Sequence, residues 1–122
     1  MKNNRINIAL ILVILIIFIT YFTFMKLTYD KDIMAKLELA ENYARQENWD
    51  QVTKESKELK EIWNSSKALI MFNFAEAEYS LFENHIDYII GGAEAKQLDT
   101  TLVHILAAQD LWENSKQVVP EP

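Results

Sequence analysis

The sequence predicts an all-α fold: an N-terminal transmembrane helix followed by a small antiparallel helical bundle of three to four helices. Residues 6–25 contain no charged side chain, although a quarter of the 122 residues are charged. Glycine and proline occur only twice each, and the first of these four residues is Gly91. Such a composition leaves little material for tight turns, which disfavours hairpin-rich β folds. The chain also lacks cysteine, which excludes a disulfide scaffold and a cysteine-ligated zinc site.

The uncharged run predicts the transmembrane helix over Ile6–Met25. Twenty helical residues rise about 30 Å, which matches the hydrocarbon core of a bilayer. A helix is required there because backbone amides in lipid must be satisfied within the segment. Aromatic residues favour the membrane–water interface, and four gather near the C-terminal end of the run: Tyr21, Phe22, Phe24 and Tyr29.

A cleaved signal peptide is the alternative interpretation of this run. Its apolar length exceeds the usual signal core of about 7–15 residues. No small-x-small cleavage site follows it, and the first alanine after the run is Ala35. We therefore expect an uncleaved signal-anchor that makes Ile6–Met25 the contact with the lipid bilayer.

The charges that flank the run favour one orientation. Lys2 and Arg5 precede it without an acidic neighbour, whereas three lysines and three acidic residues follow it by position 38. The Lys/Arg count alone is balanced once the α-amino group is included, so the preference rests on the acidic residues. We expect a single-pass protein of the cell membrane, with residues 1–5 in the cytoplasm, residues 26–117 forming an extracytoplasmic bundle and residues 118–122 a disordered tail.

Helical spacing of apolar residues predicts the first helix of the bundle over residues 32–46. Its apolar face consists of Ile33, Leu37, Ala40 and Ala44. Two starts are compatible with the sequence. Either the membrane helix continues outward into this stretch as a stalk, or Asp30 or Asp32 caps a new helix.

The second and third predicted helices cover residues 48–66 and 67–90. Asn48 is a suitable N-cap, and residues 64–66 (Asn-Ser-Ser) favour helix ends over helix interiors. Gly91-Gly92 predicts the end of the third helix, because glycine adopts the left-handed cap conformation at low cost. The apolar faces are Trp49, Val52, Ser56, Leu59 and Trp63 in the second helix, and Leu69, Phe72, Ala75, Tyr79, Phe82, Ile86 and Ile89 in the third.

The fourth predicted helix begins near Ala93, or at Thr100 behind an Asp99 cap, and ends near Lys116. Its apolar face consists of Leu98, Leu102, Ile105, Ala108 and Trp112. Amphipathic stretches joined by short polar connections favour an antiparallel bundle. The first two stretches resemble a tetratricopeptide-type hairpin in a single copy. The dipeptide Glu-Asn recurs at irregular intervals, so we predict no repeat array.

Charge and residue types argue against several functions. Residues 26–122 carry ten Lys/Arg and eighteen Asp/Glu, a net charge of −8, which disfavours binding to nucleic acid. Neither histidine has the Glu three residues earlier that a di-metal bundle uses. We therefore expect no metal, no cofactor and no catalytic residues, and we expect His85 and His104 to hydrogen-bond neighbouring helices.

Tryptophan is enriched at binding hot spots, although core packing is the ordinary role of a tryptophan on an apolar helix face. The chain has three tryptophans, and Trp49 at a predicted helix start is the best candidate for contact with a partner.

Several features occur together: the N-terminal anchor, Asn48-Trp49, Trp63, His85-Ile86-Asp87, and His104-Ile105 followed by Glu113-Asn114. In these features the chain resembles an uncharacterised bacterial domain-of-unknown-function family of short single-span membrane proteins from spore-forming Gram-positive bacteria. The resemblance covers nearly the whole chain and implies a topology rather than an activity. It also implies a multi-span membrane protein as partner. The candidate partner-binding residues of the chain are Trp49, His85 and Asp87.

From these observations we expect a membrane-anchored, non-catalytic helical domain that binds or scaffolds another protein, most simply a membrane protein. Two alternatives remain open: a helical bundle that senses a small molecule, and a structural protein of the envelope or spore membrane.

Overall fold

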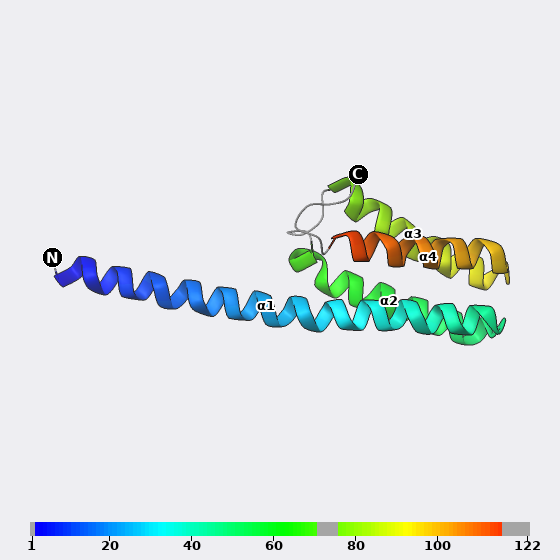
Figure 1. Cartoon of the computed structure of the whole chain (residues 1–122), viewed down its shortest axis with the longest axis horizontal. Helices are drawn as coiled ribbons and strands as arrows, with labels where there is room; N and C mark the ends of the chain where they lie inside the picture. Colours follow the sequence, from blue (N-terminus) through cyan, green and yellow to red (C-terminus); the bar gives the residue numbers. More distant parts are fainter. Residues whose placement is uncertain (1, 71–75, 116–122) are drawn as a thin grey trace.

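The computed structural model describes residues 2–70 and 76–115 of the chain (Figure 1). These residues form four helices and no strand, so the predicted all-α class is confirmed. The helices are α1 (Lys2–Arg45), α2 (Trp49–Ile70), α3 (Glu76–Glu94) and α4 (Leu98–Ser115).

Helix α1 consists of two halves with different surroundings. Large apolar side chains from Ile6 to Leu27, among them Leu12, Ile16 and Phe24, are exposed, and this half extends away from the other helices (Figure 1). From Ile33 onward, the apolar face of the same helix is buried against α2 and α4. The helix runs without a break between the two halves, so the predicted membrane helix continues into the bundle as a stalk, and no new helix is capped at Asp30 or Asp32.

The exposed half of α1 is long and apolar enough to cross a bilayer, and none of its most apolar 18-residue window is buried. The helix already includes residues 2–5, which the sequence assigned to a tail.

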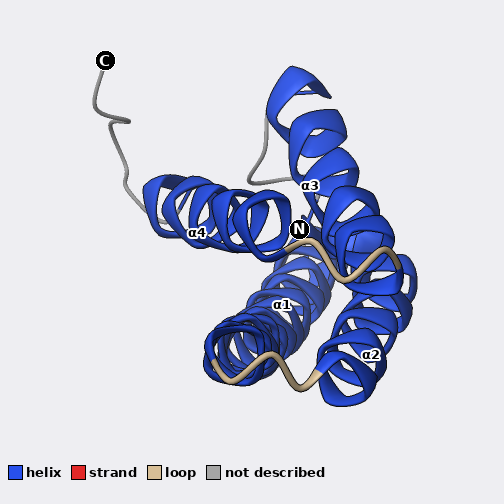
Figure 2. Cartoon of the chain, turned by 90° about the vertical axis from the view of Figure 1, so that its right-hand side faces the viewer, coloured by secondary structure: helices blue, strands red, loops and turns tan. Residues whose placement is uncertain are grey.

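The core is built from one face of each helix. α1 packs against α2 and α4, and α3 packs against the same two helices (Figure 2). The predicted apolar faces supply most of the buried apolar side chains, with Trp49, Tyr79, Leu98 and Leu102 half-buried at the margin. The fully buried group includes Ile33, Leu37, Val52, Leu59, Trp63, Phe82, Ile86, Ile89 and Ile105.

The prediction that α2 ends at residues 64–66 is wrong, because the helix continues to Ile70. The hydroxyl groups of Ser65 and Ser66 donate to the carbonyl oxygens four residues earlier, at 2.9 Å and 2.7 Å. Serine therefore remains in the helix with its polar group satisfied along the helix itself. Leu69 consequently belongs to α2, while the predicted core positions Phe72 and Ala75 lie outside the described residues.

The prediction that Gly91-Gly92 ends the third helix is also wrong. α3 runs through both glycines to Glu94, and neither glycine has a positive φ. The left-handed residue is Lys96, with φ of 55°. Gly92 instead lies against α4, where a Cβ atom would be only 2.6 Å from the Thr101 hydroxyl oxygen.

The fourth helix starts at Leu98, between the two predicted starts. The amide of Thr101 donates to the carbonyl of Gln97 at 3.1 Å, which makes Gln97 the residue that opens the helix. The predicted end at Lys116 and the tail over residues 118–122 lie outside the described residues.

The described helices contain a structural repeat, contrary to the prediction of a single hairpin copy. Glu47 and Lys96 are both left-handed with φ of 55°, and they lie 49 positions apart. The four backbone hydrogen bonds that close the α1–α2 turn recur 49 positions later in the α3–α4 turn. Each turn is a Schellman-type helix end, because the amide after the left-handed residue donates to the carbonyl five residues earlier.

The buried positions follow the same offset. The pairs are Ile33 and Phe82, Leu37 and Ile86, Ala40 and Ile89, Ala44 and Ala93, Val52 and Thr101, Ser56 and Ile105, Leu59 and Ala108, and Trp63 and Trp112. The bundle is therefore two helical hairpins of one design, whose apolar faces meet in a shared core.

The two glycines of α3 offer a matched test of this packing. Replacing Gly92 with Ala places a methyl group against Thr101, and we expect the free energy of unfolding to fall by about 1–3 kcal/mol. Gly91→Ala has open space within 4 Å and should raise stability by up to about 1 kcal/mol through helix propensity. Denaturant unfolding of the full chain in mild detergent, followed by tryptophan fluorescence, measures both. Equal effects from the two variants would contradict the close approach of α3 to α4.

Candidate functional site

The three predicted partner-binding residues do not form one surface. Trp49 is the first residue of α2, and its half-buried ring packs against the edge of the core. His85 and Asp87 both lie on α3, but they contact different helices. His85 faces α4, whereas Asp87 faces α2.

Asp87 belongs to an ion-pair cluster between α2 and α3. The ammonium group of Lys60 donates to the Asp87 carboxylate at 2.9 Å and lies 3.5 Å from Glu83. Lys57 and Glu94 form a further pair, at 3.5 Å, on the same side of the two helices. These groups are partly or largely exposed, so each pair contributes at most about 1 kcal/mol. These ion pairs help to fix the position of α3 against α2, and they add little to the free energy of folding.

His85 forms a pair with His104, as expected of a residue that hydrogen-bonds a neighbouring helix. The two Nδ1 atoms lie 2.9 Å apart, so a hydrogen bond between the two rings joins α3 to α4. Tyr88, one helical turn beyond His85, stacks on the His104 ring with centroids 4.6 Å apart. Burial, and then the nearby charge of His104, lower the pKa of His85 below its ordinary value.

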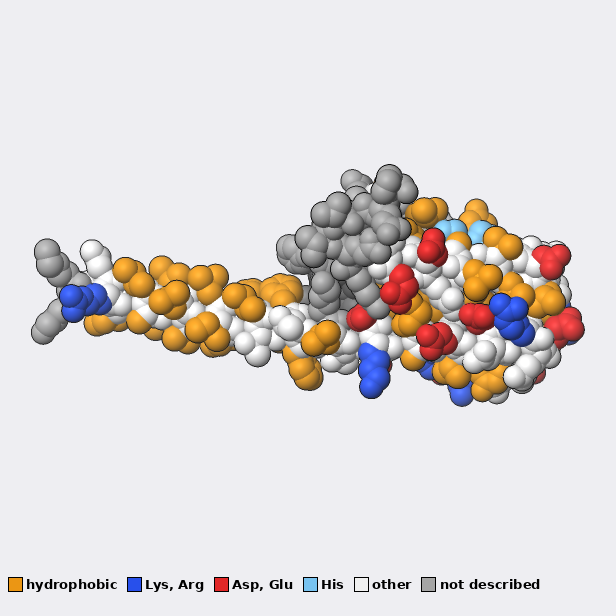
Figure 3. Space-filling model, viewed as in Figure 1, with side chains coloured by type: hydrophobic (Ala, Val, Ile, Leu, Met, Phe, Trp, Pro, Cys, Tyr) orange, Lys and Arg blue, Asp and Glu red, His pale blue; other side chains and the backbone are white. Residues whose placement is uncertain are grey.

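Apolar side chains surround this pair on the outside of the bundle. Figure 3 shows the histidine side chains at the surface, with hydrophobic side chains close to them. Tyr88 and Val103 are each more than half exposed, and Leu81 and Leu106 are also exposed. The outer side of the α3–α4 hairpin therefore offers aromatic, aliphatic and imidazole groups together.

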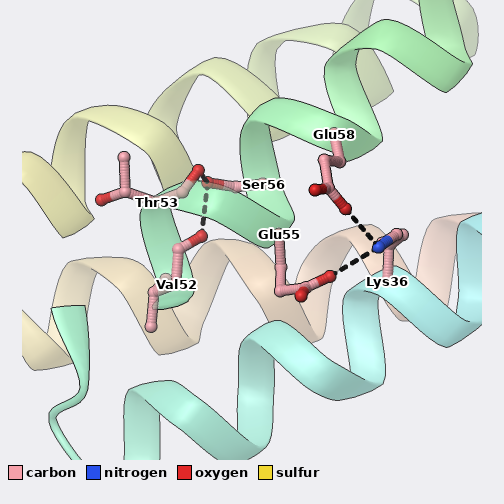
Figure 4. A network of polar contacts seen from close by, with 6 residues as sticks. All are labelled: Lys36, Val52, Thr53, Glu55, Ser56 and Glu58. Atoms are coloured by element: carbon pink, nitrogen blue, oxygen red, sulfur yellow. Dashed lines mark hydrogen bonds and ion pairs between the residues drawn. The ribbon is translucent and has the colours of Figure 1, made fainter. Parts of the chain in front are cut away.

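The equivalent place on the α1–α2 hairpin has a different chemistry (Figure 4). Lys36 lies 49 positions before His85, and Glu55 lies 49 positions before His104. The Lys36 ammonium donates to Glu55 at 2.7 Å and to Glu58. Only 9% of the Glu55 side chain is exposed, so this ion pair is far better shielded than those around Lys60.

Hydrogen bonds dominate the electrostatics of this cluster. The bonds to Glu55 and Glu58 raise the pKa of Lys36 above its ordinary value, against the opposing effect of burial. The bond from Lys36 lowers the pKa of the Glu58 carboxyl. The α1–α2 hairpin is thus closed by opposite charges, where the α3–α4 hairpin is closed by two imidazoles.

The sequence prediction missed the ion-pair cluster and the partnership of the two histidines. Both pairs join residues 19 positions apart across a helical turn. An alignment of the chain's apolar pattern with itself, shifted by 49 residues, would have placed these two pairs at equivalent positions. A search for repeated dipeptides cannot, because the two hairpins share core positions rather than residue identities.

Within residues 2–70 and 76–115, no three His, Asp or Glu side chains gather in a way that would hold a metal ion. Comparisons with known proteins found no match: no family model, no curated protein and no solved structure resembles the chain.

Variants of the Lys36 cluster test whether a buried charge contributes more to stability than an exposed one. Lys36→Met leaves the buried Glu55 without its cation, and we expect the free energy of unfolding to fall by about 3 kcal/mol. Glu58→Gln removes a 40% exposed partner and should cost clearly less than Lys36→Met, because solvent screens an exposed charge. Denaturant titration at neutral pH separates the two. A cost for Lys36→Met as small as that for Glu58→Gln would contradict the burial of Glu55.

Proposed function

We propose that this chain is a single-pass membrane protein whose helical domain, outside the cytoplasm, binds or scaffolds another membrane protein. The observation that carries the proposal is the continuity of α1. Its exposed apolar half suits lipid, and its other half forms a wall of the bundle core.

The continuous helix supports a scaffolding role for a physical reason. A flexible linker would let the domain rotate freely, whereas an uninterrupted helix fixes its height and direction relative to the bilayer. Confinement to the membrane also raises the effective concentration of the domain for any partner in the same membrane. Both effects favour binding to a second membrane protein at a defined distance from the lipid.

The surface of the domain supports the same proposal. We take the two hairpins to form an antiparallel bundle with an acidic exterior, which is repelled by anionic headgroups and by nucleic acid. A bundle held off the lipid keeps its sides open to a protein. The proposed partner is a multi-span membrane protein, in keeping with the family that the sequence resembles, and the proposed role is non-catalytic.

Sidedness tests the topology. The chain has no native cysteine, so single cysteines can be placed at the exposed positions Asn3 and Asp110. We expect the cysteine at position 110 to react with a membrane-impermeant maleimide on intact protoplasts, and the cysteine at position 3 to react only after lysis. The reverse pattern would place the bundle in the cytoplasm. Reaction at both positions only after lysis would contradict the membrane span.

Site-specific photo-crosslinking in native membranes tests the binding role. A photoreactive amino acid at Asp87 is compared with the same amino acid at Lys54, another exposed position on the bundle. We expect one discrete product with an integral membrane protein from position 87, which is lost when unlabelled chain is overexpressed as competitor. Identical products from both positions, or no saturable product, would contradict a specific surface on α3.

A further inference from the structure

The His85–His104 contact imposes a strict requirement on protons. A hydrogen bond between two Nδ1 atoms at 2.9 Å needs one atom to carry a proton and the other to present a lone pair. Two neutral rings meet this requirement when they adopt opposite tautomers. One charged ring also meets it, because its N–H donates to the neutral ring in a charge-assisted bond.

A second proton removes the bond altogether. When both imidazoles are cationic, both Nδ1 atoms are donors, no acceptor remains, and two like charges face each other across 2.9 Å. We propose that the His85–His104 pair is a proton-sensitive lock on the α3–α4 hairpin, which loosens when both rings are protonated. This property goes beyond the proposed binding role and does not depend on who the partner is.

In the described part of α3, acidic groups that share the helix with His85 form ion pairs elsewhere. On α3, Glu83 and Asp87 face α2 and pair with Lys60. On α4, Gln109 faces α1 and donates to Glu41, which also pairs with Arg45. The Tyr88 ring stacks on His104, and its π face accommodates one cation but supplies no full negative charge.

The repeat provides a natural comparison for the lock. At the equivalent positions of the α1–α2 hairpin, Lys36 and Glu55 form a lysine–carboxylate ion pair, and neither residue type ordinarily titrates in the range of pH in which imidazole does. Acidification from pH 7.5 to 5.5 therefore leaves that closure intact. Mild acid therefore affects the residue pair that closes the α3–α4 hairpin, and not the pair that closes the α1–α2 hairpin.

The direction of the response follows from proton linkage. The pKa of His85 is lowered in the folded state, so the opened hairpin binds protons more readily than the closed one. The stability of the closed hairpin is complete above the ordinary histidine value of 6.5 and is lost as pH falls through that value toward the lowered pKa. Each unit by which the pKa is lowered corresponds to a tenfold change in the opening equilibrium.

Exchange of the pair tests the lock. The double variant His85→Lys with His104→Glu transfers the charges of Lys36 and Glu55 to the second hairpin. Backbone amide hydrogen exchange is measured for the full chain in nanodiscs at pH 7.5 and 5.5, with EDTA present and with correction for intrinsic exchange. We expect protection in α3 and α4 of the wild-type chain to fall several-fold at pH 5.5, and protection in α1 and α2 to stay constant. In the double variant all four helices should stay constant.

Equal pH responses of the wild-type chain and the double variant would overturn the proposal, and so would equal losses in both hairpins. If the double variant does not fold, an NMR titration of the two imidazoles in the wild-type chain tests the proposal instead. A lock requires two coupled steps, with His85 taking up its proton at lower pH. Independent titration of the two rings at a common midpoint would overturn it.

Discussion

Because α1 is one uninterrupted helix, the same rigid element presents two different surfaces along its length. Its first half presents apolar side chains on all sides, which only lipid solvates well. Its second half presents a single apolar face, and α2 and α4 cover that face. The other three helices form the bundle together with the second half of α1. The direction of α1 beyond the apolar segment therefore sets the position of the whole bundle.

The repeat explains how a chain with few turn-forming residues makes two sharp reversals. Each reversal uses one non-glycine residue in the left-handed conformation, Glu47 or Lys96, at a cost of about 1–2 kcal/mol. Hydrogen bonds to the last helical carbonyls and burial of the following helix offset that cost. Glycine is then free for another purpose, and Gly92 allows α4 to approach α3 more closely than any side chain at that position would permit.

The polar seams distinguish two hairpins that share one core design. Equivalent apolar positions 49 residues apart can hold different apolar side chains, since a core position requires only a buried side chain of suitable volume. The positions at the outer closure are not interchangeable in this way, because Lys36 with Glu55 and His85 with His104 differ in how they respond to protons. A stable core built from repeated hairpins thereby leaves the closure positions available for properties that the core does not need.

The sequence by itself determined the uncharged segment, the helical class and most of the core. These follow from local spacing: residues such as Ile33 and Leu37 recur with the period of a helix whatever the rest of the chain does. The tertiary structure decided where helices end and which polar groups meet. Ser65 and Gly91 favour helix ends locally, but packing of the neighbouring turns keeps both inside helices. His85 and His104 became partners only because the α3–α4 turn brings positions 19 residues apart to the same level, and no local pattern encodes that distance.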